Sequence, residues 1–241
     1  LLAGVLPVLG VLLMLRDEWL AALGLAHLAA AGALLGVALG IPALFGAGLG
    51  AGAGGMTKSL TGMRGNGAYA FMILIGWSGL MLIAANSPGG EALGHALIEG
   101  QLYFAGWSEL IAALLLVLAA AMALPGLMPK LLHARFFPRH ERANRLPAWR
   151  WHLGFDLLVA LGLAVATATL GLMGAFALIL VPAWAAFRVA PSWGWTLGIS
   201  ALFGIAAYGV AFVLALGLDQ PFGPILVIVC LGLGGLVGRS A

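Results

Sequence analysis

The sequence contains few charged residues. Lys, Arg, Asp and Glu make up 8% of its 241 residues, whereas roughly a quarter of an average soluble domain is charged. Hydrophobic residues make up 63%, and the mean hydropathy is +1.12. Apolar stretches of near-spanning length recur from one end to the other, leaving no segment for a separate water-soluble domain. We therefore predict a polytopic membrane protein with a single domain over residues 1–241.

Cysteine is also scarce, and the first residues do not resemble a leader. The one cysteine, Cys230, excludes an intrachain disulfide and a zinc site built from several thiolates. Residues 1–15 are apolar but have no initiator Met and no basic leader. We therefore interpret them as a clipped first helix rather than a signal peptide.

Polar residues divide the rest into apolar segments of helical length. Several are shorter than the ~20 residues that cross the hydrocarbon core, so we expect tilted, broken or buried helices. The predicted fold is an all-α polytopic membrane bundle of eight or nine spans. The candidate segments are residues 1–15, 19–39, 42–56, 67–85, 106–127, 153–170, 171–187, 193–218 and 222–238.

The basic residues predict the orientation. Residues 129–152 hold six of the eleven Lys and Arg residues, and basic loops stay on the cytoplasmic side. Alternation through nine spans then puts the other five inside as well: Arg16, Lys58, Arg64, Arg188 and Arg239. The outer side receives four acids and no Lys or Arg: Glu91, Glu99, Glu109 and Asp219. Two explanations account equally well for the acids on the outer side. They form an outer vestibule that attracts cations, or they lie there because acids have little effect on topology.

The basic loop contains a candidate docking helix. Pro138 and Pro147 bracket "RHERANRL", about two helical turns, and aromatic residues lie on either side. This pattern predicts a short helix at the membrane surface that docks a partner. The alternative is a loop held against anionic lipid headgroups. Nucleic-acid binding is not expected, because the basic residues adjoin membrane spans.

Three motif-like stretches do not support an enzyme. Gly50 to Gly55 fits G-x-G-x-x-G but follows an apolar helical stretch instead of a strand, which favours helix packing. Residues 52–59 resemble a phosphate-binding loop, but Thr57 replaces its second glycine. His140-Glu141 begins like a zinc-protease motif, but Asn144 replaces the second histidine.

Three further motifs together carry a family resemblance. Arg16 is followed by Ala26-His27 and then by Gly32 and "GVALG". "LGLMGAFALILVPAWAA" is a Gly-rich helix that ends in Pro-Ala, and "LDQPFGPILVIV" is a D-x-P-x-G-P turn into the last segment. In their order and spacing they resemble the permease subunits of ABC importers for zinc, manganese and iron. The motif residues of the second and third are Gly171, Pro182, Asp219, Pro221, Gly223 and Pro224.

The resemblance implies a type II importer-like transport subunit in the bacterial inner membrane. Such a subunit pairs with a second copy or a paralogue and receives a divalent metal ion, zinc or manganese, from a periplasmic binding protein. ATP hydrolysis resides on a separate cytoplasmic ATPase, so the chain itself is not an enzyme and holds no permanent cofactor. The family's coupling helix falls on Arg139, His140, Glu141, Arg142, Ala143, Asn144, Arg145, Leu146 and Pro147.

His27 is the first candidate metal ligand, since a buried ionisable group in a membrane usually faces a partner or an aqueous path. The alternative is a histidine that donates to a backbone carbonyl between packed helices. Many family members have an acid four residues before this histidine, where this chain has Leu23, and a second acidic position is Gln101 here.

Glu109 is the second candidate metal ligand, with snorkelling of its side chain to the membrane interface as the alternative. Asp156 is expected to pair with Arg150 or His152, or to cap local structure, rather than to contact the cargo.

Two other functions remain open. The related importers of cobalamin and siderophores would suit a poor metal site. A membrane scaffold or enzyme subunit without transport activity would use the basic loop to recruit a soluble partner.

Overall fold

The computed structural model describes residues 1–61, 66–100, 102–137 and 139–240. Arg64, Gln101 and Pro138 lie outside the described residues. The described chain is helical, with α-helices α1 to α11 and one 3₁₀ turn, η1 at Leu102–Phe104. The α-helices are α1 Leu2–Leu15, α2 Ala21–Ala38, α3 Ala43–Thr61, α4 Asn66–Asn86, α5 Gly90–Glu99, α6 Trp107–Phe136, α7 His140–Ala143, α8 Trp149–Leu170, α9 Leu172–Val189, α10 Trp193–Leu218 and α11 Phe222–Ser240.

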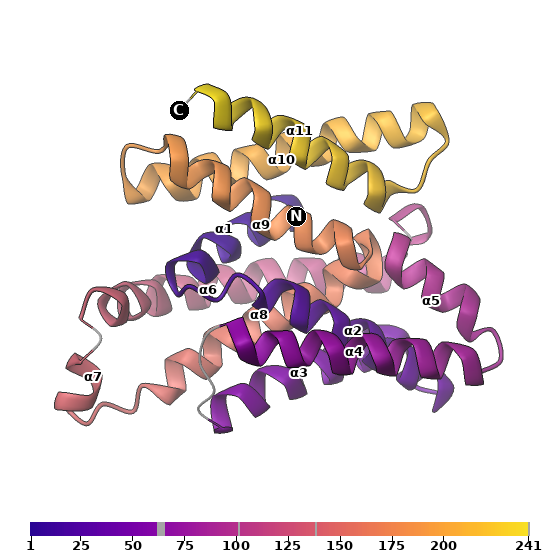
Figure 1. Cartoon of the computed structure of the whole chain (residues 1–241), viewed down its shortest axis with the longest axis horizontal. Coiled ribbons are helices and arrows are strands. Elements are labelled where there is room, and N and C mark those ends of the chain that lie inside the picture. Colours follow the sequence, from indigo (N-terminus) through magenta and orange to yellow (C-terminus); the bar gives the residue numbers. More distant parts are fainter. Residues whose placement is uncertain (62–65, 101, 138, 241) are drawn as a thin grey trace.

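The helices form two groups that meet along the middle of the molecule (Figure 1). Helix α2 packs on α3 and α4 in the lower group, and α9 packs on α10 and α11 in the upper one. Helices α1 and α8 lie between them, and α8 contacts both α3 and α9. The core is accordingly richest in residues of α1, α2, α8 and α9, which are buried along most of their length.

The all-α prediction is confirmed, and each of the nine predicted segments contains a helix. The count of eight or nine spans is not confirmed. Within the described residues, six helices are long and apolar enough to cross a membrane: α2, α4, α6, α8, α9 and α10. Helices α1 and α11 are apolar but shorter. Helix α6 extends nine residues beyond the predicted 127 because it accommodates Pro125 and Pro129 within the helix.

Glycines let α2 and α3 approach until their backbones touch. A Cβ atom at Gly32 would lie 2.4 Å from the carbonyl oxygen of Gly46, and one at Gly50 would lie 2.2 Å from that of Leu28. No side chain fits at either position. The interpretation of Gly50 as a packing residue is therefore confirmed, whereas a Cβ at Gly52 would meet nothing within 4 Å.

A second close approach joins the ends of α5, α8 and α11. Gly100 and Gly171 have positive φ angles of 90° and 78°, a conformation that favours glycine. A Cβ at Gly171 would lie 2.5 Å from the nitrogen of Gly100. A Cβ at Gly223 would lie 2.3 Å from the carbonyl oxygen of Glu99. We call Gly100, Gly171 and Gly223 the glycine junction. It brings together two motif residues that are 52 positions apart in the sequence.

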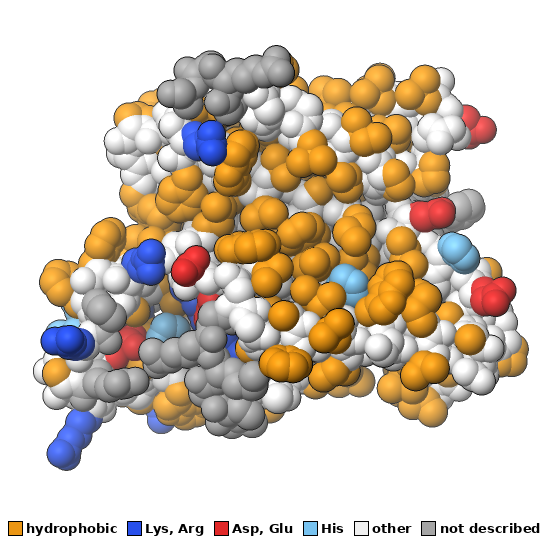
Figure 2. All heavy atoms as spheres, in the orientation of Figure 1, with side chains coloured by type: hydrophobic (Ala, Val, Ile, Leu, Met, Phe, Trp, Pro, Cys, Tyr) orange, Lys and Arg blue, Asp and Glu red, His pale blue; other side chains and the backbone are white. Residues whose placement is uncertain are grey.

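The visible charges are distributed as the orientation predicts. Figure 2 shows Lys and Arg side chains at the left end, where α7 lies, and none at the right end, where α5 lies. Between the ends the surface is largely hydrophobic, as lipid contact requires. The chain is thus a multi-pass membrane protein with one basic end, which we call the inner end, and an opposite outer end.

The glycine junction leads to a stability prediction. Gly223→Ala should lower the melting temperature of the detergent-purified protein, because the added methyl would overlap backbone oxygens, a fault that typically costs about 1–3 kcal/mol. Gly232→Ala in the same helix is the control, because a Cβ there would meet nothing within 4 Å. The junction would be unimportant if both variants melted at the wild-type temperature.

Candidate functional site

His27 lies inside the bundle, between α2 and α4. Its side chain is 3% exposed, and Gly76 of α4 packs directly against its backbone and Cβ. The imidazole ring meets the Trp77 ring edge-on, with 6.1 Å between the centroids. Nδ1 lies 2.8 Å from the carbonyl oxygen of Leu23, one turn earlier on α2. The contact expected for a packed histidine is therefore present.

This hydrogen bond is also compatible with metal binding. When Nδ1 donates to Leu23, the lone pair of the neutral ring is on Nε2. Metal-binding histidines are usually held in this way, with one ring nitrogen donating to a carbonyl and the other facing the ion. The geometry of His27 therefore fits both interpretations.

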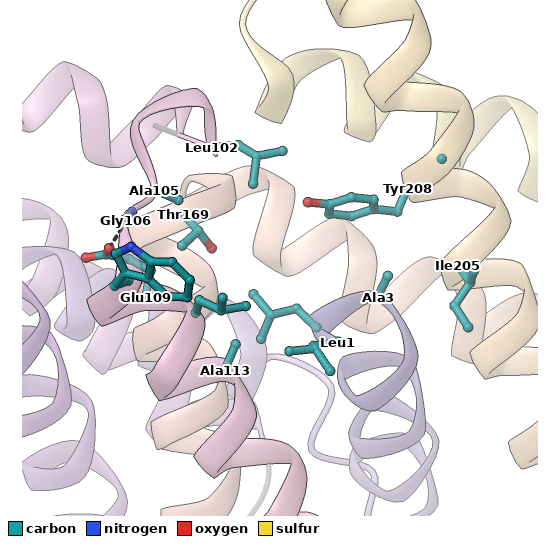
Figure 3. A pocket seen from close by; sticks show the side chains of 14 residues that line it. Leu1, Ala3, Leu102, Ala105, Gly106, Glu109, Ala113, Thr169, Ile205 and Tyr208 are labelled. Atoms are coloured by element: carbon teal, nitrogen blue, oxygen red, sulfur yellow. Dashed lines mark hydrogen bonds between the residues drawn. The ribbon is translucent and has the colours of Figure 1, made fainter.

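Glu109 lies at the outer end, beside a cavity of about 780 Å³ between α1, α6 and α10. In Figure 3 its carboxylate points toward the backbone of Gly106, away from the middle of the cavity. It accepts hydrogen bonds from the Gly106 nitrogen and the Ser108 hydroxyl, each at 2.8 Å. Glu109 thus closes the first turn of α6. His27 does not line this cavity, so the two predicted ligands lie in separate surroundings.

No ready-made metal site accompanies these two residues. Among the residues that the structure describes, no group of three or more His, Cys, Asp and Glu side chains is placed to hold an ion.

The predicted docking segment lies at the inner end, and part of it is helical. Helix α7 covers only His140–Ala143, about one turn, where two turns were predicted. Glu141 accepts a hydrogen bond from Trp151 Nε1 at 3.0 Å and lies 3.4 Å from Nε2 of His152, both in the first turn of α8. The neighbouring residues Arg139, His140, Ala143, Asn144, Arg145, Leu146 and Pro147 are exposed.

Four charged side chains are buried together near the inner end of α8, and we call them the charge cluster: Arg16, Glu18, Lys58 and Asp156. Arg16 contacts Asp156 at 2.7 Å and Glu18 at 2.8 Å. Lys58 contacts Glu18 at 2.8 Å and Asp156 at 3.1 Å. The two cations and two carboxylates thus form a closed, neutral ring in which every side chain is less than 10% exposed.

Neighbouring groups complete this ring. The Ser59 hydroxyl donates to Asp156 at 3.2 Å, and the Arg16 guanidinium lies 5.0 Å from the centre of the Phe155 ring. Burial would lower the pKa of Arg16, but the charges of Asp156 and Glu18 outweigh it and raise the pKa above its usual value. Arg16 therefore stays charged.

The prediction for Asp156 was wrong. It pairs with Arg16 and Lys58 instead of Arg150 or His152. These partners lie 140 and 98 positions away along the chain, so no local pattern could have indicated them. The sequence uses Arg16 and Lys58 to predict the orientation, and Arg16 begins the first family motif, but neither pattern indicates an ion pair with Asp156.

The remaining motif residues lie at helix ends or inside a helix. Gly171 and Gly223 form part of the glycine junction, and Pro182 is buried within α9. Asp219 ends α10 in the left-handed conformation, with φ of 51°. Pro221 and Pro224 flank the start of α11. Apart from Pro182, these residues shape the outer end, and none of them lines the cavity beside Glu109.

The sequence did not predict one contact between two histidines. The rings of His133 in α6 and His140 in α7 meet edge-on, with 4.4 Å between centroids. Their irregular spacing gave no reason to connect them. The break in the helix between Phe136 and His140 allows the contact.

Comparisons with known proteins agree with the fold. The model of the ABC 3 transport family matches residues 1–234. The structure of PsaBC from Streptococcus pneumoniae in complex with a Fab is similar, with a TM-score of 0.83, 17% identity, and coverage of 98% of this chain and 86% of that one. A transporter assigned to the metal-chelate ABC type, in an inward-facing conformation, has a TM-score of 0.69, 19% identity, and coverage of 100% and 83%. No curated protein matches the sequence.

The charge cluster leads to a second stability prediction. Asp156→Asn should destabilise the protein by about 3–5 kcal/mol, because it leaves an uncompensated positive charge in a site nearly free of water. Glu91→Gln, at an exposed outer position, should stay within about 0.5 kcal/mol of wild type. Chemical denaturation in detergent micelles measures both. Equal stability of the two variants would contradict the importance of the cluster.

Proposed function

Because the chain belongs to the ABC 3 transport family, we propose that it is the permease subunit of an importer that moves a divalent transition metal, zinc or manganese, into the cytoplasm. The match of the family model over residues 1–234 carries this proposal. The fold shared with PsaBC supports it. We expect the permease to reside in the bacterial inner membrane.

His27 is the residue that we propose to contact the ion during transport. Neutral imidazole binds borderline metals such as zinc, and the bond from Nδ1 to Leu23 leaves Nε2 for the ion. Trp77 meets the imidazole edge-on and is itself 46% exposed, so a shift of this indole would expose His27 at the surface of the protomer. Glu109 would attract the cation at the outer end.

A sparse site suits a transporter, which must release its ion. A second permease copy would add a symmetric imidazole, and a periplasmic binding protein would supply the high affinity. The chelate type of importer is the second candidate. Leu23 and the lack of a metal-binding group among the described residues favour it, because a chelated ion brings its own ligands.

The energy source is a separate ATPase that docks on residues 139–147. Seven residues of this segment, Arg139, His140 and 143–147, are exposed at the inner end, and Glu141 is hydrogen-bonded to Trp151 of α8. Movement of a docked partner would therefore be transmitted to α8. ATPase closure would then rock the helices around His27 from outward to inward access.

His27→Ala should lower uptake of radiolabelled Zn²⁺ or Mn²⁺ into proteoliposomes by roughly tenfold or more, as loss of a metal-positioning group commonly does. Met72→Ala is the control, because it removes buried volume from the same contact between α2 and α4 without touching the imidazole. Equal loss in both variants would reduce His27 to a packing residue. Uptake of a chelate but not of the free ion would favour the second candidate.

Arg145→Glu should weaken co-purification of the ATPase by roughly tenfold or more, because it reverses a charge on the docking segment. Arg188→Glu reverses a charge at the inner end of α9, outside this segment, and should leave co-purification unchanged. A stable wild-type complex without any nucleotide-binding subunit would instead favour the scaffold function.

A further inference from the structure

The charge cluster has no role in the transport pathway or in the docking surface described so far. It nevertheless joins α8, which contacts the docking segment, to the end of α3 and to the turn between α1 and α2. Arg16 and Glu18 belong to the turn between α1 and α2, Lys58 to the end of α3, and Asp156 to the second turn of α8. Three segments that are distant in the sequence are therefore tied at one point by ion pairs.

The first link runs from the docking segment to α8. Glu141 is held by Trp151 and His152, so α7 and the first turn of α8 are joined by side-chain contacts. Asp156 follows His152 by four residues, and residues with this spacing lie on the same face of a helix. A displacement of α7 therefore reaches Asp156 through a single helical turn.

The second link runs from Asp156 to the helices around His27. Asp156 contacts Lys58 and Ser59 at the end of α3, and it contacts Arg16, the C-cap of α1 in the turn that leads to α2. Helix α3 in turn touches the backbone of α2 at Leu28, the residue next to His27. Such backbone contact leaves no soft side chains to absorb a movement of α3.

We propose that Asp156 is a positioning residue that couples the docking segment to the helix carrying His27. The proposal rests on the proposed function, since it assigns the route by which ATPase movement reaches the transport site. Asp156 does not touch the cargo. It makes the turn before α2, the end of α3 and the start of α8 move as one body.

The burial of the cluster indicates a rigid tie rather than a gate. Opening the ring would leave charges uncompensated in surroundings almost free of water, which is strongly unfavourable. A gate must open in every cycle, whereas a tie can stay closed throughout. The cluster is also neutral as a whole, so moving it as a unit requires no change in charge.

A disulfide can replace the ionic tie. A Cβ at Gly55 of α3 would lie 3.8 Å from the Cβ of Asp156, which is the mean distance across a disulfide. The variant Gly55→Cys/Lys58→Met/Asp156→Cys removes one charge of each sign and keeps the pair of Arg16 and Glu18. The native Cys230 is buried in α11 and does not interfere.

The test compares this variant, oxidised and reduced, in complex with its co-purified ATPase and binding protein in proteoliposomes. The readout is the number of Zn²⁺ or Mn²⁺ ions imported per ATP hydrolysed. We expect the reduced form to fall by roughly fivefold or more below wild type, and the oxidised form to recover. Both states come from one preparation, so a difference in folding does not explain the change.

Two results would overturn the proposal. Loss of transport on oxidation would mean that α3 and α8 separate in the cycle and that the cluster is a gate. Equal coupling in the oxidised, reduced and wild-type proteins would leave the cluster a purely structural role.

A second variant covers failure of the cysteine variant to assemble. Lys58→Met/Asp156→Asn should recover the melting temperature lost by Asp156→Asn, because charge balance is restored, yet its import per ATP should stay low. Recovery of both quantities would overturn the proposal. If no ATPase binds the wild-type chain at all, it is the proposed function that fails.

Discussion

Four charges of this protein lie in a site from which water is almost excluded, and each has a partner of opposite sign within about 3 Å. Removing any one of them would leave a charge that neither lipid nor protein can solvate. The turn between α1 and α2, the end of α3 and the start of α8 are therefore bound to one another. This constraint adds to the glycine contacts that pack α3 on α2, the helix that carries His27.

Glycine contacts hold the helices together at the interfaces where no ion pairs form. At the interface of α2 and α3, and at the junction of α5, α8 and α11, backbones touch directly and exclude side chains. Lipid gives helices no hydrophobic reason to associate, so close backbone contact takes over that role in a membrane. The inner end is thus held by ion pairs and the outer end by glycines.

The sequence predicted the parts of the structure that the membrane dictates. Hydropathy located nine helices, and the distribution of Lys and Arg identified the basic end, because both follow from the cost of placing polar groups in lipid. The motif pattern also indicated the family. The count of eight or nine spans is not confirmed: within the described residues six helices are long and apolar enough to cross, α1 and α11 are apolar but shorter, and α3, with Lys58 and many glycines, is in neither group.

The site was less predictable for a physical reason. Ion pairs between residues 98 and 140 positions apart leave no periodic signal, and the charge cluster was missed for this reason. His27 could be singled out because a lone imidazole in an apolar segment is unusual. Its hydrogen bond to a backbone carbonyl was predicted only as the alternative to metal binding, and the sequence did not identify Leu23 as the partner. Glu109 was recognised as an outer-end acid, but its bonds to Gly106 and Ser108 became visible only in the structure.

The central claim is that the charge cluster stays closed while the protein changes its access. Structures of the complete transporter, determined without nucleotide and with bound ATP, test this most directly. We expect the contacts of Asp156 with Arg16 and Lys58 to persist in both states while α7 and α8 move relative to α10 and α11. A state in which α3 and α8 separate and these contacts break would contradict the claim.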